Sequence, residues 1–463
     1  MTYDVKPGIK PPLDDSFRPA VLCNHAFLTD VEASGSPVPL TIGIEQADGT
    51  RSLYQTHVLP KGHPQAEANL KYVERAVKFL LWQRGGHKVY VGGPAEIGEY
   101  IKQAYTPTGL RAFDMDLYAG VYEKPFEVVV TAADKVPPAQ EASIPLGRHL
   151  EGCRVGFDLG ASDCKFSAVV NGTSDFAEAE EVEWNPKAQK DPRYHYHAIM
   201  SGLYLAANKL PRVDAIGGSS AGIIINNRVR IASLFRGVEK EKFDEGVGGL
   251  FPRIAREWGV PFEVINDGEV TALAGSMSLG VNAILGIALG SSEAGGYVNR
   301  DGNVTKWLDE LAFAPIDYAA DAPQDDWSKD IGCGANYLSQ QAVFRLAPAV
   351  GIAIDKGLSD VKRLAFVQEQ LAKGSEQARL IFETIGVYLG YAVAHYADYY
   401  DLSHVLILGR VTSGECGDIV MARCQEVLKT EFPELAKVIS VNLPDEKARR
   451  VGQSVAAASL PAL

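Results

Sequence analysis

Beyond residue 150, apolar runs typical of β-strands alternate with segments that have the periodicity of helices. Each apolar run leads into glycine, serine or an acidic residue. The runs lie at 154–159, 213–216, 262–266 and 283–289. Such alternation predicts an α/β fold in which helices cover the faces of sheets. Because ligands in these folds collect at the carboxyl ends of strands, the residues that follow the runs are the first candidates for a site.

The composition is that of an ordinary globular protein, and 463 residues are enough for two or three domains. The 45 basic and 58 acidic residues give a net charge of −13, which argues against a nucleic-acid partner. The six cysteines form no Cys-x-x-Cys pair, and no apolar run has the length of a leader or a membrane span. We therefore expect free thiols, a cytoplasmic location and no membrane partner.

The first 140 residues have the pattern of a small α/β unit. A hairpin is expected over 40–58, with its turn at Asp48-Gly49, and a helix with apolar residues 70, 73, 77, 80 and 81 follows it. Strands are expected at 88–91 and 126–130, before a proline-rich boundary near residue 138. Further on, the Tyr-His-Tyr-His run at 194–197 is expected as a strand at a solvent-exposed edge rather than as a metal site.

The segment 155–170 is predicted to be a β-hairpin that binds a phosphate. Asp158 ends an apolar strand, Gly160 lets the backbone turn, and Lys165 enters the return strand. Such a turn directs amide groups and an ammonium at an anion, while the carboxylate of Asp158 holds Mg²⁺ through water. A hairpin with no ligand is the alternative, since strand turns of this composition are common.

Asn266 and Asp267 end a second apolar strand, immediately before a helix. Phosphoryl transfer from ATP to a hydroxyl needs a carboxylate that accepts the proton, and Asp267 is the candidate, with Asn266 orienting the acceptor. The alternative is an ordinary helix N-cap, which these residue types favour by themselves.

Two more turns complete the pattern. Gly290, Ser291 and Ser292 form a small-residue turn whose amides and hydroxyls suit a second phosphate contact; a tight hairpin is the alternative. Gly409 and Thr412 follow a strand and a long helix, where a flat adenosine base can lie against the backbone; a generic strand-to-helix turn is the alternative.

In this order, the four elements resemble the actin, hexokinase and Hsp70 superfamily of ATP-binding proteins, and within it the ROK family of sugar kinases and sugar-responsive repressors. The resemblance covers about residues 154–460, including the Gly-Gly-Ser-Ser-Ala-Gly run at 217–222 and the closing segment 449–456. It implies two RNase H-like lobes with a central ATP cleft. The lobes are expected at 150–268, to which a helix at about 448–463 returns, and at 269–447, after an N-terminal α/β extension over 1–140.

The resemblance also implies roles for single residues. Asp267 is the general base. The substrate side is expected to include Ser220, Asn226, Asn266, Glu310 and Gln340, the last at the position of a second sugar-contacting Glu.

Other positions also depart from the pattern of the family. Phe313 stands where ROK kinases have a zinc-binding His, and Cys333 is the one cysteine of three that remains, so no zinc site is expected. Glu293 adjoins the second phosphate turn, where a carboxylate is unfavourable unless it points away or meets Mg²⁺. Arg410 replaces a small residue beside the adenosine base.

The resulting hypothesis is an ATP- and Mg²⁺-dependent kinase of a sugar hydroxyl whose two lobes close on the sugar, with a homodimer as the expected assembly. The alternative is a sugar or nucleotide sensor without catalysis. Because no helix-turn-helix is readable before residue 140, a DNA-binding repressor is not expected.

Overall fold

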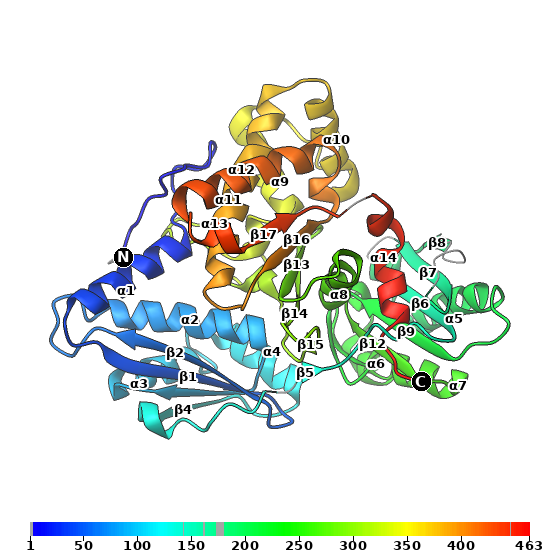
Figure 1. Cartoon of the computed structure of the whole chain (residues 1–463), viewed down its shortest axis with the longest axis horizontal. Helices are drawn as coiled ribbons and strands as arrows, with labels where there is room; N and C mark the ends of the chain where they lie inside the picture. Colours follow the sequence, from blue (N-terminus) through cyan, green and yellow to red (C-terminus); the bar gives the residue numbers. More distant parts are fainter. Residues whose placement is uncertain (1–2, 142, 161–162, 173–179, 445) are drawn as a thin grey trace. The chain divides into compact units, whose positions relative to one another are not determined.

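The computed structural model describes residues 3–141, 143–160, 163–172, 180–444 and 446–463 (Figure 1). The chain divides into two compact units. Unit 1 consists of Met1–Ala142, Ala288–Ala294 and Lys306–Asn442. Unit 2 consists of Ser143–Ile287, Gly295–Thr305 and Leu443–Leu463. The chain therefore passes from one unit to the other inside two strands, β13 (Ile284–Leu289) and β14 (Glu293–Val298).

Unit 1 begins with a four-stranded sheet of order β2-β1-β3-β4. Its strands are β1 (Val38–Glu45), β2 (Arg51–Val58), β3 (Lys88–Gly92) and β4 (Glu127–Thr131). The hairpin expected over 40–58 is confirmed, because β1 and β2 pair antiparallel around Gly49, whose φ of 89° favours glycine. The helices of this region are α1 (Ala20–Ala33), α2 (Ala68–Arg84), α3 (Ala95–Ala104) and α4 (Ala112–Tyr122).

The helix α2 is buried along most of its length. It ends at Gly85, as the sequence predicted, with a φ of 68°. The apolar face that the sequence indicated is buried, and so are the charged residues Glu74, Arg75 and Lys78 on the same helix. The polar side of this helix is therefore covered by the rest of unit 1 and does not face solvent.

The remainder of unit 1 is mainly helical. Its helices are α9 (Gln340–Leu346), α10 (Asp360–Ala372), α11 (Glu376–Ala397), α12 (Glu415–Glu431) and α13 (Leu435–Val438), and its strands β16 (His404–Leu408) and β17 (Ser440–Asn442) are parallel. The helix α2 packs into this region: Phe79 stacks on Tyr399 at 4.0 Å between ring centroids, and Gln83 Nε2 donates to the Tyr399 carbonyl at 3.0 Å. The N-terminal residues thus share a unit with residues 306–442.

Unit 2 is built on a five-stranded sheet of order β12-β9-β6-β7-β8. Its strands are β6 (Cys153–Leu159), β7 (Asp163–Val170), β8 (Glu180–Glu183), β9 (Ala215–Ser220) and β12 (Phe262–Asn266). The hairpin β6–β7 is antiparallel, as predicted, whereas β6, β9 and β12 are parallel. Shorter strands are β10 (Ile223–Ile225), β11 (Arg228–Ile231), β15 (Val304–Thr305) and β5 (Ser143–Ile144).

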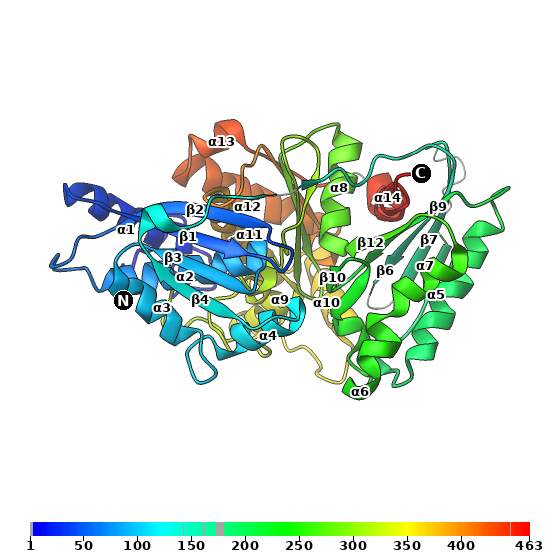
Figure 2. The ribbon, with the colours of Figure 1, turned by 90° about the horizontal axis from the view of Figure 1, so that it is seen from below.

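Helices cover both faces of this sheet (Figure 2). They are α5 (Pro192–Ala207), α6 (Lys240–Phe243), α7 (Leu250–Trp258), α8 (Asp267–Leu279) and α14 (Glu446–Ala458). Along β6, Val155 and Phe157 join the core with α5 and α7, and the intervening Gly156 faces α14. A Cβ at Gly156 would collide with the Ser454 carbonyl oxygen, so the closing helix requires glycine there.

The expectation of a strand over residues 194–197 is wrong, because these residues belong to α5. The physical reason is the N-cap: Asp191 accepts a hydrogen bond from the amide of Arg193 at 3.0 Å, and Pro192 opens the helix. His195 is buried in the helix, and its Nε2 lies 3.0 Å from the Pro186 carbonyl oxygen.

All six cysteines are buried and unpaired, which confirms the expectation of free thiols. Among the described residues, no helix is both long and apolar enough to span a membrane.

Candidate functional site

The parallel strands β6, β9 and β12 bring three predicted segments of the site to one edge of the sheet in unit 2. Asp158 of β6 pairs in register with Ser219 of β9, and Ser220 pairs with Asn266 of β12. Because the carboxyl ends of parallel strands meet at one edge, Asp158, Ser220 and Asp267 lie along the same edge. Together the three residues span about one hundred positions of the sequence.

Asp158 is buried at this edge and is held by a neighbour. The Ser219 hydroxyl donates to Asp158 Oδ1 at 2.8 Å. Burial raises the pKa of Asp158, while this hydrogen bond and the charge of Lys165 work in the opposite direction. Lys165 is the cross-strand partner of Asp158 on β7, and its Nζ lies 3.9 Å from Asp163 Oδ1. The predicted carboxylate and ammonium are therefore neighbours.

The turn that joins β6 and β7 is closed by its own backbone. The Gly160 amide donates to the Asp163 carbonyl at 2.9 Å, and Trp184 Nε1 donates to the Gly160 carbonyl at 2.8 Å. Both polar groups of Gly160 thus have protein partners. Ala161 and Ser162, which the sequence placed in this turn, lie outside the described residues.

Asn266 forms the N-cap of α8. Its Oδ1 accepts from the Gly268 amide at 2.7 Å and its Nδ2 donates to the Gly222 carbonyl at 2.8 Å. Its own amide donates to Glu269 Oε2 at 3.2 Å, which completes a capping box. The capping role that was the alternative at this position is therefore present, and it fixes the backbone from which Asp267 projects.

Asp267 is half-buried in the first turn of α8. Burial, together with the charge of Asp158, raises the pKa of Asp267 to about 6, while the Gly268 amide, 3.0 Å from Oδ1, works in the opposite direction. Such a carboxyl is ionised near neutral pH and is a stronger base than an ordinary aspartate. It therefore has the properties that a general base needs.

The hairpin β10–β11 carries Asn226 in its turn. Asn226 is exposed, and both Asn226 (φ 52°) and Asn227 (φ 59°) are left-handed, as in a two-residue hairpin turn. Asn227 was not singled out from the sequence. It accepts from the Val264 amide at 2.6 Å and donates to the Phe262 carbonyl at 3.2 Å, which ties the hairpin to β12. The adjacent pair of asparagines between two apolar runs was the signal for this turn.

Unit 1 carries the second predicted phosphate turn. The Gly290 amide donates to the Ser292 carbonyl at 3.0 Å, and Ser291 and Ser292 are exposed. Glu293 points into the interior of the unit, where it is buried and its Oε1 accepts from the Tyr396 hydroxyl at 2.8 Å. Burial raises the pKa of Glu293 to about 8, so the side chain is mostly neutral at pH 7. Glu293 therefore places no negative charge beside the turn.

The predicted adenosine loop follows β16 in unit 1. Gly409 has a φ of 103°, and a Cβ there would collide with the Leu289 carbonyl oxygen, so this position requires glycine. Thr412 is fully buried, and its hydroxyl donates to the Gly409 carbonyl at 3.0 Å. The side chain of Thr412 thus stabilises the loop by a hydrogen bond within it. Arg410 is exposed.

Glu310 and Gln340 lie in unit 1 on either side of a loop region. The Glu310 amide donates to the Trp82 carbonyl of α2 at 3.0 Å. Gln340 is buried at the start of α9, where its amide donates to the Gly290 carbonyl at 3.0 Å and its Nε2 to Asp360 Oδ2 at 3.4 Å. The backbone of Gln340 therefore adjoins the second phosphate turn.

Phe313 and Cys333, which the resemblance matched to zinc ligands of ROK kinases, are both packed within unit 1. Phe313 packs against Trp82 and Trp327, with ring centroids at 4.6 and 5.0 Å. Cys333 is buried and the pKa of its thiol is raised to about 12 by burial. Within the part of the chain that the structure describes, no three His, Cys, Asp or Glu side chains form a group able to hold a metal ion.

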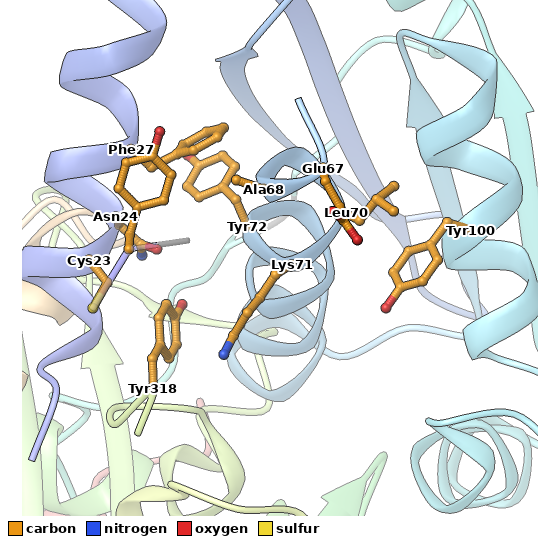
Figure 3. Close-up of a pocket in the computed structure, with 11 residues that line it drawn as sticks. Cys23, Asn24, Phe27, Glu67, Ala68, Leu70, Lys71, Tyr72, Tyr100 and Tyr318 are labelled. Atoms are coloured by element: carbon orange, nitrogen blue, oxygen red, sulfur yellow. The ribbon is translucent and has the colours of Figure 1, made fainter. Parts of the chain in front are cut away.

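A separate cavity of about 420 Å³ lies among α1, α2, α3 and Tyr318 in unit 1 (Figure 3). Its lining includes Cys23 and Phe27 of α1, Lys71 and Tyr72 of α2, and Tyr100 of α3. The predicted site residues do not line it.

Comparison with solved structures finds the same fold in ROK proteins. A ROK family glucokinase from Streptomyces griseus, solved with glucose and AMPPNP, superposes with a TM-score of 0.51 at 18% identity over 66% of this chain and 99% of its own. A ROK hexokinase from Thermus thermophilus superposes with a TM-score of 0.50 at 15% identity, over 66% of this chain and 97% of its own. A ROK family transcriptional regulator, a homolog of the E. coli MLC protein, superposes with a TM-score of 0.52 at 16% identity, over 67% of this chain and 78% of its own.

At these identities the likeness shows the fold. The chain therefore has the α/β fold of the ROK proteins, which are of the two-lobed actin/hexokinase type, as its sequence predicted. No family model and no curated protein matches the sequence. About a third of the chain lies outside the structural match.

Proposed function

We propose that this protein transfers the γ-phosphoryl group of ATP to a hydroxyl of a sugar or sugar derivative. The observation that carries the proposal is Asp267: a half-buried carboxyl with a pKa of about 6 at the carboxyl edge of a parallel sheet, next to the charge of Asp158. The fold supports the proposal, because ROK sugar kinases share it.

We propose that Asp158, at this edge, would hold Mg²⁺ through water. Asp158 is an oxygen donor, and its charge acts on Asp267 strongly enough to raise the pKa of that carboxyl. A divalent cation next to Asp158, bound through water, would offset this repulsion. When bound, Mg²⁺ neutralises charge on the phosphates of the nucleotide.

In the proposed reaction the acceptor hydroxyl oxygen forms a bond to the γ-phosphorus, and the bond from that phosphorus to the β,γ-bridging oxygen breaks. Asp267 accepts the hydroxyl proton, and ADP leaves. Asn266 acts by fixing the first turn of α8, since its side chain is used in the cap. This assignment makes Asp267 the one proton acceptor of the step.

The other residues would bind substrates. Glu310, Gln340, Ser220 and Asn226 are proposed for the acceptor, and Gly160, Lys165, Gly290, Ser291 and Ser292 for the phosphates. Gly409 is proposed to border the adenosine, with Thr412 supporting its loop. We also propose a cytoplasmic homodimer.

ADP release across a panel of hexoses, N-acetylhexosamines and polyols tests the function. Asp267→Asn keeps the shape of the side chain and removes the base, so we expect a loss of roughly 10²–10⁴-fold in kcat at an unchanged melting temperature. Asp301→Asn, at an exposed turn of the same unit, is the matched control. Equal turnover by Asp267→Asn would remove this residue as the base.

A sensor without catalysis is the second candidate, because the same fold is found in a ROK transcriptional regulator. A thermal shift assay separates the two. Stabilisation by a sugar, with no shift from millimolar Mg-ATP and no ADP release, would favour the sensor.

A further inference from the structure

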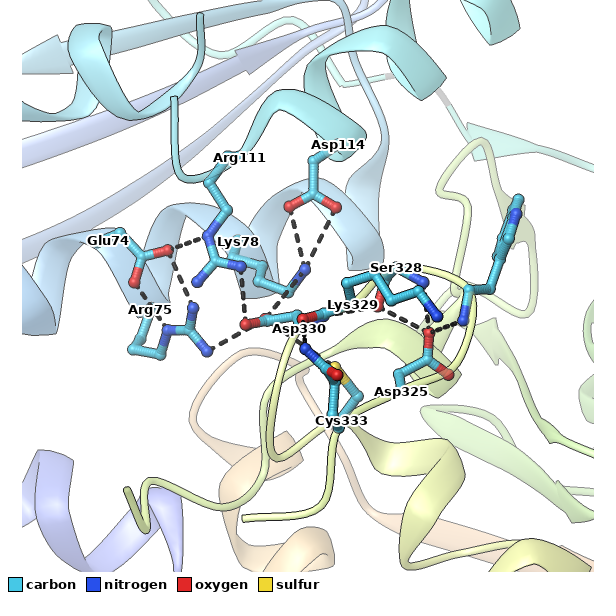
Figure 4. A network of polar contacts seen from close by, with 12 residues as sticks. Glu74, Arg75, Lys78, Arg111, Asp114, Asp325, Ser328, Lys329, Asp330 and Cys333 are labelled. Atoms are coloured by element: carbon cyan, nitrogen blue, oxygen red, sulfur yellow. Dashed lines mark hydrogen bonds and ion pairs between the residues drawn. The ribbon is translucent and has the colours of Figure 1, made fainter. Parts of the chain in front are cut away.

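A buried network of six charged side chains connects α2 and α4 with the loop over residues 325–333 of unit 1 (Figure 4). The members are Glu74, Arg75 and Lys78 of α2, Arg111 and Asp114 at the start of α4, and Asp330 of the loop. None of these side chains is more than 9% exposed. Three cations face three anions, so their formal charges cancel.

Asp330 is the one member of the network that belongs to the loop, and three cations surround it. Its Oδ2 lies 3.3 Å from Arg75 Nη1 and 3.2 Å from Lys78 Nζ, and its Oδ1 lies 2.9 Å from Arg111 Nη1. Burial acts to raise the pKa of Asp330, but the charges of Arg75 and Lys78 outweigh it, so the pKa lies below its usual value. Asp330 is therefore ionised and fixed from three directions.

The other two carboxylates hold the cations in place. Glu74 accepts from Arg75 Nε at 2.8 Å and also bonds Arg111, while Asp114 accepts from Lys78 Nζ at 3.0 Å. Asp114 thus belongs to the network through Lys78, whereas Asp330 alone joins it to the loop. Asp114 and Asp330 therefore form a matched pair for mutation: both are buried carboxylates of the network, but only Asp330 belongs to the loop.

The loop leads directly to the segments proposed for the acceptor. The Gly332 carbonyl accepts from the Ile316 amide at 2.9 Å, and the Gly334 amide donates to the Ala314 carbonyl at 3.0 Å. The loop is therefore hydrogen-bonded to the chain that follows Glu310. Gln340 begins the next helix. The C-terminal end of α2 binds the chain just before Glu310, since the Gln83 carbonyl accepts from the Asp309 amide at 2.8 Å.

We propose that Asp330 is a positioning residue for the acceptor: through it, α2 and α4 fix the segment that connects Glu310 with Gln340. The inference rests on the proposed function for its kinetic part only. Loss of the Asp330 charge leaves three buried cations without their shared partner, so the loop loses its ion pairs with α2 and α4. The proposal gives α2 and α4, both before residue 142, a role in acceptor binding.

Asp330→Asn and Asp114→Asn, made in the full chain, test the proposal. Each removes one buried carboxylate of the network without changing side-chain shape, but only Asp330 belongs to the loop. We expect amide hydrogen exchange over residues 325–340 to quicken about tenfold or more in Asp330→Asn and to stay near wild type in Asp114→Asn. For the acceptor we expect KM to rise about tenfold in Asp330→Asn, with KM for ATP within about twofold of wild type.

Equal exchange over 325–340 in the two variants would overturn the proposal, and so would a KM for ATP that rises as much as the acceptor KM. Exchange needs no turnover, so it decides the positioning role even where the wild-type protein phosphorylates no sugar, an outcome that removes the proposed function instead. Should Asp330→Asn not fold, Arg111→Lys keeps the charge and loses the planar fork. Its exchange over 325–340 must then rise above that of Asp114→Asn; exchange equal to that of Asp114→Asn overturns the proposal.

Discussion

Replacement of Glu293 by glutamine is expected to remove a pH dependence of stability, so that the variant gains stability relative to the wild type as the pH rises above about 5. Glu293 is 2% exposed, and the Tyr396 hydroxyl donates to its Oε1. Its Oε2 has no hydrogen-bond partner among the described residues. Glutamine keeps the shape and the acceptor for Tyr396, and it replaces a group that must stay protonated in the folded state.

The direction of the change in stability with pH follows from the pKa values of Glu293 in the unfolded and the folded chain. Burial raises the pKa of Glu293 from 4.5 to about 8, so between these values the unfolded chain releases a proton that the folded chain retains. The contribution of this group to stability is therefore complete below pH 4.5 and is lost as the pH rises toward 8. At about 1.4 kcal/mol per pH unit, the wild type loses about 3 kcal/mol relative to Glu293→Gln between about pH 5.5 and about pH 7.5.

Urea unfolding followed by tryptophan fluorescence at these two pH values measures the effect. The quantity of interest is the difference between variant and wild type at the higher pH minus the same difference at the lower pH, because other titrating groups cancel in it. Glu415→Gln, at an exposed position in α12, is the control and should follow the wild type. A double difference near zero for Glu293→Gln would refute a neutral, buried Glu293.

Two further predictions concern the turns and the base. Gly409→Ala should lower the melting temperature by several degrees or more and weaken ATP binding, because the new Cβ would collide with the Leu289 carbonyl oxygen. Gly290→Ala is the control, since its Cβ would come no nearer than 3.7 Å to Ser292, and it should melt like the wild type in the same scan. The value of kcat/KM for the acceptor should rise with pH through about 6, because Asp267 accepts a proton only when ionised; a flat profile from pH 5 to 7 would contradict its role as the base.

The sequence predicted those parts of the fold that depend on local pattern. The hairpin β1–β2 follows from apolar alternation around Asp48-Gly49, and the end of α2 follows from Gly85. The burial of Arg75 and Lys78 did not follow, because their partner Asp330 lies about 250 residues away in the chain. A charged helix face normally indicates exposure to solvent. Only the contact with the distant Asp330 explains why this face is buried.

The same distinction applies to the candidate site. Asp158 and Asp267 were predictable, because each ends an apolar strand, and the parallel order of β6, β9 and β12 then places them along one edge. The sequence left two orientations open for Glu293, toward the phosphates or away from them. The choice depends on Tyr396, 103 residues later, which binds the carboxyl in the interior.

A raised pKa by itself does not distinguish a catalytic carboxyl from a structural one. Burial raises the pKa of Asp317 to about 6, the same value as for Asp267. Asp317, however, is 2% exposed, and its oxygens accept from the amides of Arg18 and Ala319 and from the Tyr337 hydroxyl. Glu293 is buried likewise. Of these three, Asp267 is the one that is only partly buried, and the charge of Asp158 contributes to the shift of its pKa. Access to a reacting hydroxyl, and not basicity, therefore selects Asp267 for the proposed reaction.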